Sequence, residues 1–236
     1  MSSLLSPDLK TSYNFGYDEN NNPNKKPIIG YDLFPENIRL YSSIKSIKIW
    51  YGNPPDEQNI KSLLGIQVMY LNYFTGEKKM TEYQGSQITE LNVETKELNI
   101  KEDDYLSKVY LGFNQFITHL KFETKNGDSI EIGNIIEEQE KNSVNDINEG
   151  RNIIMNIKGY IFPKGIRTIG FEYMPYKKFF FNRLIDLFRL RHKVQKEFKD
   201  KYNNLEEINK LNYEMKCALK ICQLPDTHFS CIIKYL

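Results

Sequence analysis

The sequence lacks the features that direct a chain into a membrane or along the secretory route. No apolar run approaches the roughly 18 residues that are needed to span a bilayer. The first residues, "MSSLLSPDLKTSYNF", contain no basic segment followed by an apolar one. The many asparagines form no N-x-S/T acceptor site for glycosylation. We therefore expect a cytoplasmic protein with no transmembrane segment.

An excess of charge of one sign is also missing. The chain has 236 residues, with 32 Lys and Arg against 31 Asp and Glu, and a net charge of +1. This balance does not favour nucleic acid as a partner, because binding to phosphates requires a basic surface. No glycine spacing of the G-x-G-x-x-G or P-loop kind occurs. We therefore predict no nucleotide cofactor, and no other cofactor.

Cysteine is scarce and gathered near the C-terminus. An odd set of three is a poor disulfide framework. Cys217, Cys222, His228 and Cys231 have the side chains that zinc prefers, but their spacing is not a familiar zinc motif. Cys217 and Cys222 also lie more than one turn apart on a predicted helix. The sequence therefore predicts buried structural thiols and no metal site.

No catalytic constellation is visible. No Ser or Cys combines with a His and an acid in a recognisable motif. His119 alternates with Leu120 and Phe122, so we expect it to face away from the core. The acidic pairs Asp103-Asp104 and Glu137-Glu138 lie in polar loops, where such pairs are usually solvated. We predict that the protein is not an enzyme.

The middle of the chain has the two-residue period of β-strands. In "LLGIQVMYLNY", Ile66, Val68 and Tyr70 share one face, and similar short strands recur between residues 44 and 173. Asn126-Gly127 indicates a type I′ hairpin turn. We predict three regions: an irregular N-terminal arm over residues 1–37, an all-β domain over residues 38–175, and a helical C-terminal extension over residues 176–236. Within the arm, "IIGYDLF" is consistent with one strand.

The C-terminal extension changes to a helical period. Asn204 and Glu207 fit a capping box, so one long helix and a hairpin of two helices both remain open. The apolar stripe recurs every three or four residues: Leu187, Leu190, Val194, Phe198, Tyr202, Leu205, Ile208, Leu211, Met215 and Leu219.

The start of this extension joins aromatic and basic residues. "KKFFFNRLIDLFRLRHKVQKEFKDK" holds nine Lys and Arg against three Asp and Glu. The readings are an interfacial membrane helix, a calmodulin-type target, a helix that docks on an acidic protein, or a helix packed on the β-domain with a solvated basic face. Our candidate docking residues are Phe179, Phe180, Phe181, Leu184, Arg189, Arg191 and Lys193.

Four blocks of the β-region, in order, resemble the jacalin-like lectin domain over about residues 44–173. The blocks are "LLGIQVMYLN", "EDDYLSKVYLGF", "FITHLKFETKNG" and "IKGYIFPKGIRTIGFEY". The resemblance implies a β-prism, in which three four-stranded antiparallel sheets enclose one apolar core with pseudo-threefold arrangement. It also implies a sugar site at one end of the prism.

The resemblance places the usual sugar-binding loop on Pro163, Lys164, Gly165 and Arg167. In the family, a G-x-x-x-D loop precedes the last strand, and its Asp accepts hydrogen bonds from sugar hydroxyls. Arg167 stands at the Asp position and Pro163 at the Gly position. Arginine has only donors, and proline lacks a backbone N–H. The usual sugar site is therefore expected to be degenerate.

These observations predict a jacalin-type β-prism followed by a helical extension, with a non-catalytic function. We expect a lectin-like scaffold or interaction protein, fixed by its terminal arm and helices into a larger complex of other proteins. A cytoskeletal, ciliary or axonemal assembly would fit the expected cytoplasmic location. The alternative is a carbohydrate-binding lectin that uses a shifted, non-standard site.

Overall fold

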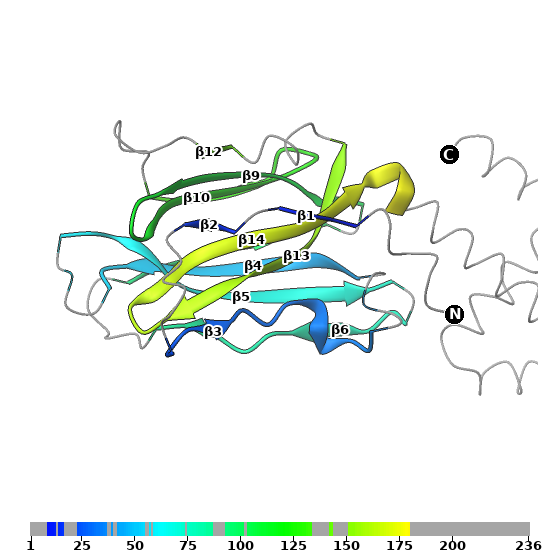
Figure 1. Cartoon of the computed structure of the whole chain (residues 1–236). Helices are drawn as coiled ribbons and strands as arrows, with labels where there is room; N and C mark the ends of the chain where they lie inside the picture. Colours follow the sequence, from blue (N-terminus) through cyan, green and yellow to red (C-terminus); the bar gives the residue numbers. More distant parts are fainter. Residues whose placement is uncertain are drawn as a thin grey trace, which may run out of the picture.

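The computed structural model describes most of the predicted β-region. The described residues are 9–12, 14–16, 23–36, 39, 42–54, 57, 59–73, 75–86, 93–101, 103–133, 142–143 and 151–179. Three antiparallel sheets are each built on one pair of long neighbouring strands, and these pairs run in roughly the same direction (Figure 1). This confirms the all-β architecture that the sequence predicts.

The first sheet is built on β13 (Asn152–Phe162) and β14 (Gly165–Pro175). These two strands pair along their whole length, from Asn152 opposite Pro175 to Phe162 opposite Gly165. Three two-residue strands lie at its edges: β1 (Lys10–Thr11) and β2 (Phe15–Gly16) pair with β14, and β3 (Lys26–Pro27) pairs with β13.

The second sheet is built on β4 (Ser42–Gly52) and β5 (Ser62–Asn72). It is extended on one side by β8 (Glu94–Asn99), which pairs with β4. On the other side β6 (Lys78–Met80) and β7 (Gln84–Gly85) both pair with β5.

The third sheet has the order β11, β10, β9, β12. Its strands are β9 (Leu106–Phe113), β10 (Ile117–Thr124), β11 (Ser129–Ile132) and β12 (Asn142–Ser143).

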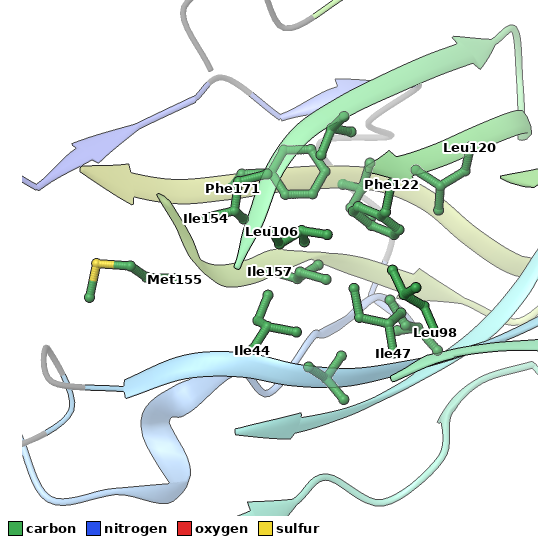
Figure 2. Packing of buried hydrophobic residues seen from close by; sticks show 14 of the residues in the cluster. Ile44, Ile47, Leu98, Leu106, Leu120, Phe122, Ile154, Met155, Ile157 and Phe171 are labelled. Carbon is green, nitrogen blue, oxygen red and sulfur yellow. The ribbon is translucent and has the colours of Figure 1, made fainter. Parts of the chain in front are cut away.

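One apolar core lies between the three sheets. Ile47 from the second sheet, Phe122 from the third and Ile157 from the first are fully buried in the same cluster (Figure 2). The rings of Phe122 and Phe171 meet edge to face, with their centroids 6.0 Å apart. Burial of β-branched and aromatic side chains from alternating strand positions is the main source of stability for such a domain.

The N-terminal arm takes part in this core. The described part of residues 1–37 adds three short strands to the first sheet, which differs from the irregular arm that the sequence predicts. The strand expected over residues 28–34 is wrong, because Tyr31–Leu33 forms a 3-10 helix. Ile28, Tyr31 and Phe34 are all buried in the core, although only Tyr31 lies within that helix.

A buried amide attaches the arm to two of the sheets. The Oδ1 of Asn156 on β13 accepts hydrogen bonds from the backbone N–H of Tyr31 (3.0 Å) and from the hydroxyl of Tyr70 on β5 (3.1 Å). Its Nδ2 donates to Glu172 on β14 (2.9 Å). A Cβ at Gly30 would lie only 1.8 Å from Oδ1, so this close approach requires glycine.

Two local expectations are corrected by the structure. The N–H of Gly127 donates to the carbonyl of Thr124, so the turn is centred on Lys125 and Asn126 rather than on Asn126 and Gly127. Asp104 is not solvated but 2% exposed, and its Oδ1 accepts hydrogen bonds from the backbone N–H groups of Tyr105 (2.8 Å) and Asn126 (3.3 Å).

Several predictions concern residues outside the described part of the chain. Residues 176–179 form a single helical turn after β14, and the predicted helix or helical hairpin beyond them is not described. The same holds for Glu137-Glu138 and for the cluster of cysteines with His228. No helix among the described residues has the length and apolar character needed to cross a membrane.

The Asn156 junction gives a first prediction. Asn156→Ala removes one acceptor and one donor and leaves buried groups of Tyr31, Tyr70 and Glu172 without these partners. We expect the free energy of unfolding to fall by about 2–4 kcal/mol. Urea denaturation measures this, with Asn99→Ala on the exposed side of β8 as the control, which should cost less than about 0.5 kcal/mol. Equal losses in the two variants would contradict a special role for the junction.

Glu172 gives a prediction for pH. Burial alone would raise the pKa of its carboxyl, but hydrogen bonds from the Tyr31 hydroxyl and the Asn156 amide, together with the Lys158 ammonium at 3.4 Å, lower it on balance. The folded pKa thus lies below the unfolded value of about 4.3, so this stabilisation is present above that pH and is lost as the pH falls through the folded pKa.

We therefore expect Glu172→Gln to flatten the decrease in unfolding free energy between about pH 5 and pH 3. Denaturation series at several pH values measure this. Glu36→Gln, at a side chain 87% exposed, controls for the loss of one charge. A Glu172→Gln profile parallel to that of the wild type would show that the carboxylate does not contribute.

Candidate functional site

The four residues of the predicted sugar loop lie on one tight hairpin. Pro163 and Lys164 alone connect β13 to β14, and Phe162 pairs with Gly165 across the turn. Gly165 has φ +133°, and a Cβ there would lie 2.8 Å from the carbonyl oxygen of Leu63. Because the turn lies so close to the start of β5, there is no room for any side chain at residue 165.

Lys164 contacts the loop that joins β4 to β5. Its ammonium lies 3.3 Å from Glu57 Oε1, and the two side chains are 35% and 38% exposed. An ion pair at this exposure is screened by water and contributes little to stability. The ion pair does, however, engage Glu57, a carboxylate that lies beside the turn.

Arg167 packs on two buried aromatic rings. Its guanidinium carbon lies 4.9 Å from the centroid of Phe116 and 5.4 Å from that of Phe162. Such cation–π contacts hold the cation at the end of the prism. The structure therefore brings Pro163, Lys164, Gly165 and Arg167 together, and this segment offers cationic donors where the resemblance calls for a carboxylate acceptor. That it is a degenerate sugar loop stays a prediction.

The opposite end of the prism holds the beginning of the C-terminal extension (Figure 1). The rings of Tyr105 and Tyr176 stack 4.6 Å apart, and the Lys125 ammonium lies within 6 Å of both. Phe179 packs edge to face on Tyr73 at 5.9 Å and is 2% exposed. Phe179, a candidate docking residue, thus packs on the prism.

The other six candidate docking residues lie outside the described part of the chain. They are Phe180, Phe181, Leu184, Arg189, Arg191 and Lys193. Their role stays a prediction.

His119 is also buried, although its strand position suggests an outward direction. Its Nε2 lies 2.9 Å from Glu131 Oε1 on the neighbouring strand, and the histidine is 2% exposed. The hydrogen bond with His119 lowers the pKa of the Glu131 carboxyl, and the charges of Lys121 and Lys96 act in the same direction. We see in this pair a structural contact on the third sheet.

Sequence reasoning did not single out an aromatic pair on the outer face of the second sheet. Trp50 and Tyr83 are both partly exposed, and their rings meet edge to face at 4.8 Å. Trp50 pairs across the strands with Gly65 of β5, and Gly65 pairs with Gly85 of β7. The signal in the sequence is the single tryptophan two residues after Lys48 on an alternating strand. Tyr83 could not be added to it without the register of β5 and β7.

Comparisons with known proteins give a fold but no close relative. No protein-family model matches the chain, and no curated protein matches it. Among solved structures, Calsepa lectin in complex with a biantennary N-glycan has a TM-score of 0.50 and 19% identity, over 71% of this chain and 97% of that one. AcmJRL, a mannose-binding jacalin-related lectin from Ananas comosus, has a TM-score of 0.48 and 14% identity, over 71% of this chain and 99% of that one.

The match to Calsepa lectin agrees with the observed topology. It extends over nearly the whole of that lectin. The three antiparallel sheets and their common core agree with what the resemblance in the sequence implies, although two of the sheets have five strands instead of four. The described part of this chain therefore has the β-prism fold of the jacalin-related lectins.

Proposed function

We propose that the chain is a non-catalytic, carbohydrate-binding module of the lectin kind, with its site shifted away from residues 163–167. The observation that supports this most is the β-prism itself, which the chain shares with a lectin solved in complex with an N-glycan. Fold alone does not determine function, so the site chemistry has to agree.

The site chemistry supports a shift. Sugar hydroxyls bind best where a charged acceptor and several donors converge. At the β13–β14 turn, Lys164 and Arg167 only donate, Pro163 has no N–H, and Glu57 is already paired with Lys164. A sugar that entered there would find its strongest acceptor occupied. We therefore expect a neutral sugar to bind elsewhere on the prism.

A titration tests this proposal. We expect the full chain to bind a methyl pyranoside of mannose, galactose or glucose with a Kd in the millimolar range or tighter, measured by calorimetry against a buffer blank. Lys164→Ala and Arg167→Ala should each change the Kd by less than about threefold, which corresponds to less than about 0.7 kcal/mol.

Two results would count against it. Failure of the wild-type chain to bind any of these sugars, or of a wider glycan array, would contradict the carbohydrate function. Loss of binding in either variant, with the fold intact by circular dichroism, would show that the sugar binds at residues 163–167.

A second function is supported by a separate observation. The aromatic contacts of Tyr176 and Phe179 attach the beginning of the C-terminal extension to the prism. Such an anchor would suit a lectin-derived scaffold that is held in a larger protein complex by its extension. Its cytoplasmic location, in a cytoskeletal or ciliary structure for example, is part of this second proposal and rests on the sequence.

Deletion of residues 180–236 tests the scaffold function. The truncated chain should keep its prism, because the described aromatic contacts end at Phe179. It should no longer co-purify with the proteins that a tagged full-length chain captures from cells. Unchanged capture by the truncated chain, identified by mass spectrometry, would show that the extension is not the docking element.

A further inference from the structure

The single tryptophan of the chain has a fixed position on the outer face of the second sheet. Trp50 lies on β4, two residues before its end at Gly52. Tyr83 meets it edge to face at 4.8 Å. Both residues are partly exposed, so they contribute to the surface and not only to the core. Because aromatic rings are apolar and rigid, they provide contact area at low cost in conformational entropy.

Tyr83 packs closely against two glycines, and its hydroxyl is hydrogen-bonded to the backbone. A Cβ at Gly65 would lie 2.3 Å from the Tyr83 ring, and one at Gly85 would lie 2.4 Å from its hydroxyl oxygen. The hydroxyl donates to the carbonyl of Ser86 at 2.9 Å. Burial raises the pKa of the Tyr83 phenol to about 12, so it stays neutral at physiological pH. The ring that supports Trp50 is therefore preorganised.

Polar groups with both hydrogen-bonding roles surround Trp50. Lys48, whose ammonium lies 5.2 Å from the Trp50 ring centroid, pairs across the strands with Glu97 on β8. Glu97 is exposed and accepts one hydrogen bond, from the Ser46 hydroxyl at 3.4 Å. On the other side Lys48 pairs with Gln67, whose amide N–H donates to Thr81 at 3.0 Å and whose carbonyl oxygen can accept.

We propose that this surface, formed by Trp50, Lys48, Gln67 and Glu97, binds a neutral hexopyranose. The inference rests on the proposed carbohydrate function and names the shifted site. The C–H face of the sugar ring would lie against Trp50. Sugar hydroxyls would donate to the Glu97 carboxylate and accept from the Lys48 ammonium. The surface has one cation, Lys48, and one anion, Glu97, so its charges balance, which is why we infer a neutral sugar.

Glu97 supplies the acceptor that is missing at Arg167. Trp50 pairs with Gly65, and Leu63, two residues before it on β5, lies beside the β13–β14 turn. The proposed surface is thus at the same end of the prism as the usual sugar loop, but on the outer face of a different sheet. Lys48 has to leave the Trp50 ring when a sugar binds, and a cation–π contact at an exposed position is weak.

The other two sheets carry similar aromatic residues without such an acceptor. Tyr110 lies under Lys121 at 5.7 Å, and Tyr160 lies under Lys25 at 4.7 Å. The described carboxylates on the strands beside these tyrosines are engaged: Glu123 pairs with Lys108 at 2.6 Å, Glu131 with His119 at 2.9 Å, and Glu172 with Lys158 at 3.4 Å.

Among the described residues, Glu97 by contrast has no ion-pair partner within 4 Å. This difference makes Tyr110 and Tyr160 matched controls for Trp50.

The experiment uses the full-length chain and the methyl pyranosides of mannose, galactose and glucose as probes. Because Trp50 is the single tryptophan, its fluorescence reports directly on the proposed surface. We expect a saturable change in that emission, with the same Kd by calorimetry. Trp50→Ala and Glu97→Gln should weaken binding at least about tenfold, and Trp50→Phe by less than about threefold, since a ring remains. Tyr110→Ala and Tyr160→Ala should bind as the wild type does.

The outcomes separate this site from the function on which it rests. If the wild type binds none of these sugars, both proposals fail. If it binds but Trp50→Ala and Glu97→Gln bind equally well, the proposed function stands and this site is wrong. Glu97 is exposed, so Glu97→Gln keeps the test valid even where Trp50→Ala lowers stability. Equal losses in the tyrosine controls would also overturn the assignment, because they would show that no one aromatic surface is special.

Discussion

The buried amide of Asn156 is the interaction on which the closed shape of the prism depends most. It lies on the first sheet, accepts from a tyrosine of the second sheet and from the backbone of the N-terminal arm, and donates to Glu172. A buried amide with both its donor and its acceptor satisfied fixes one geometry, because any shift of a neighbouring strand would leave polar groups without partners. Gly30 makes this contact feasible, since a side chain there would collide with the amide.

This junction explains why the arm belongs to the domain. The 3-10 segment Tyr31–Leu33 bridges the first and second sheets, with Lys79 of β6 donating to the carbonyl of Leu33 at 3.1 Å. Residues that precede the long strands thereby connect the first sheet to the second. A closed frame of this kind can hold side chains at its ends and on its outer faces with little reorganisation on binding.

Three surfaces of this frame have different chemistry. The β13–β14 turn presents Lys164 and Arg167, and both are engaged by other side chains. At the opposite end, the stacked rings of Tyr105 and Tyr176 hold the start of the C-terminal extension. The outer face around Trp50 combines an aromatic ring with an exposed carboxylate. We propose that the acceptor for a sugar lies on this neighbouring sheet and not at the β13–β14 turn.

Local periodicity predicts the strands well, because alternation of buried and exposed side chains is a property of adjacent residues. Thus Ile66, Val68 and Tyr70 share the buried face as expected. Periodicity does not predict features that depend on contacts between segments far apart in the sequence. The carboxylate of Asp104 accepts a hydrogen bond from the N–H of Asn126. The N–H of Tyr31 donates to Asn156, which lies 125 residues further along the chain. The grouping of Trp50 with Tyr83 and Glu97 likewise depends on strand order and register, which alternation does not determine.

The central claim is that sugar contacts the face around Trp50 and not residues 163–167. The most direct test is a titration of the isotopically labelled chain with a methyl pyranoside, followed by two-dimensional NMR of the N–H groups. The indole N–H of Trp50 is a single, unambiguous signal, because the chain has no other tryptophan. We expect this signal and the backbone signals of Lys48, Gln67 and Glu97 to shift together to saturation. Shifts confined to residues 163–167 would contradict it.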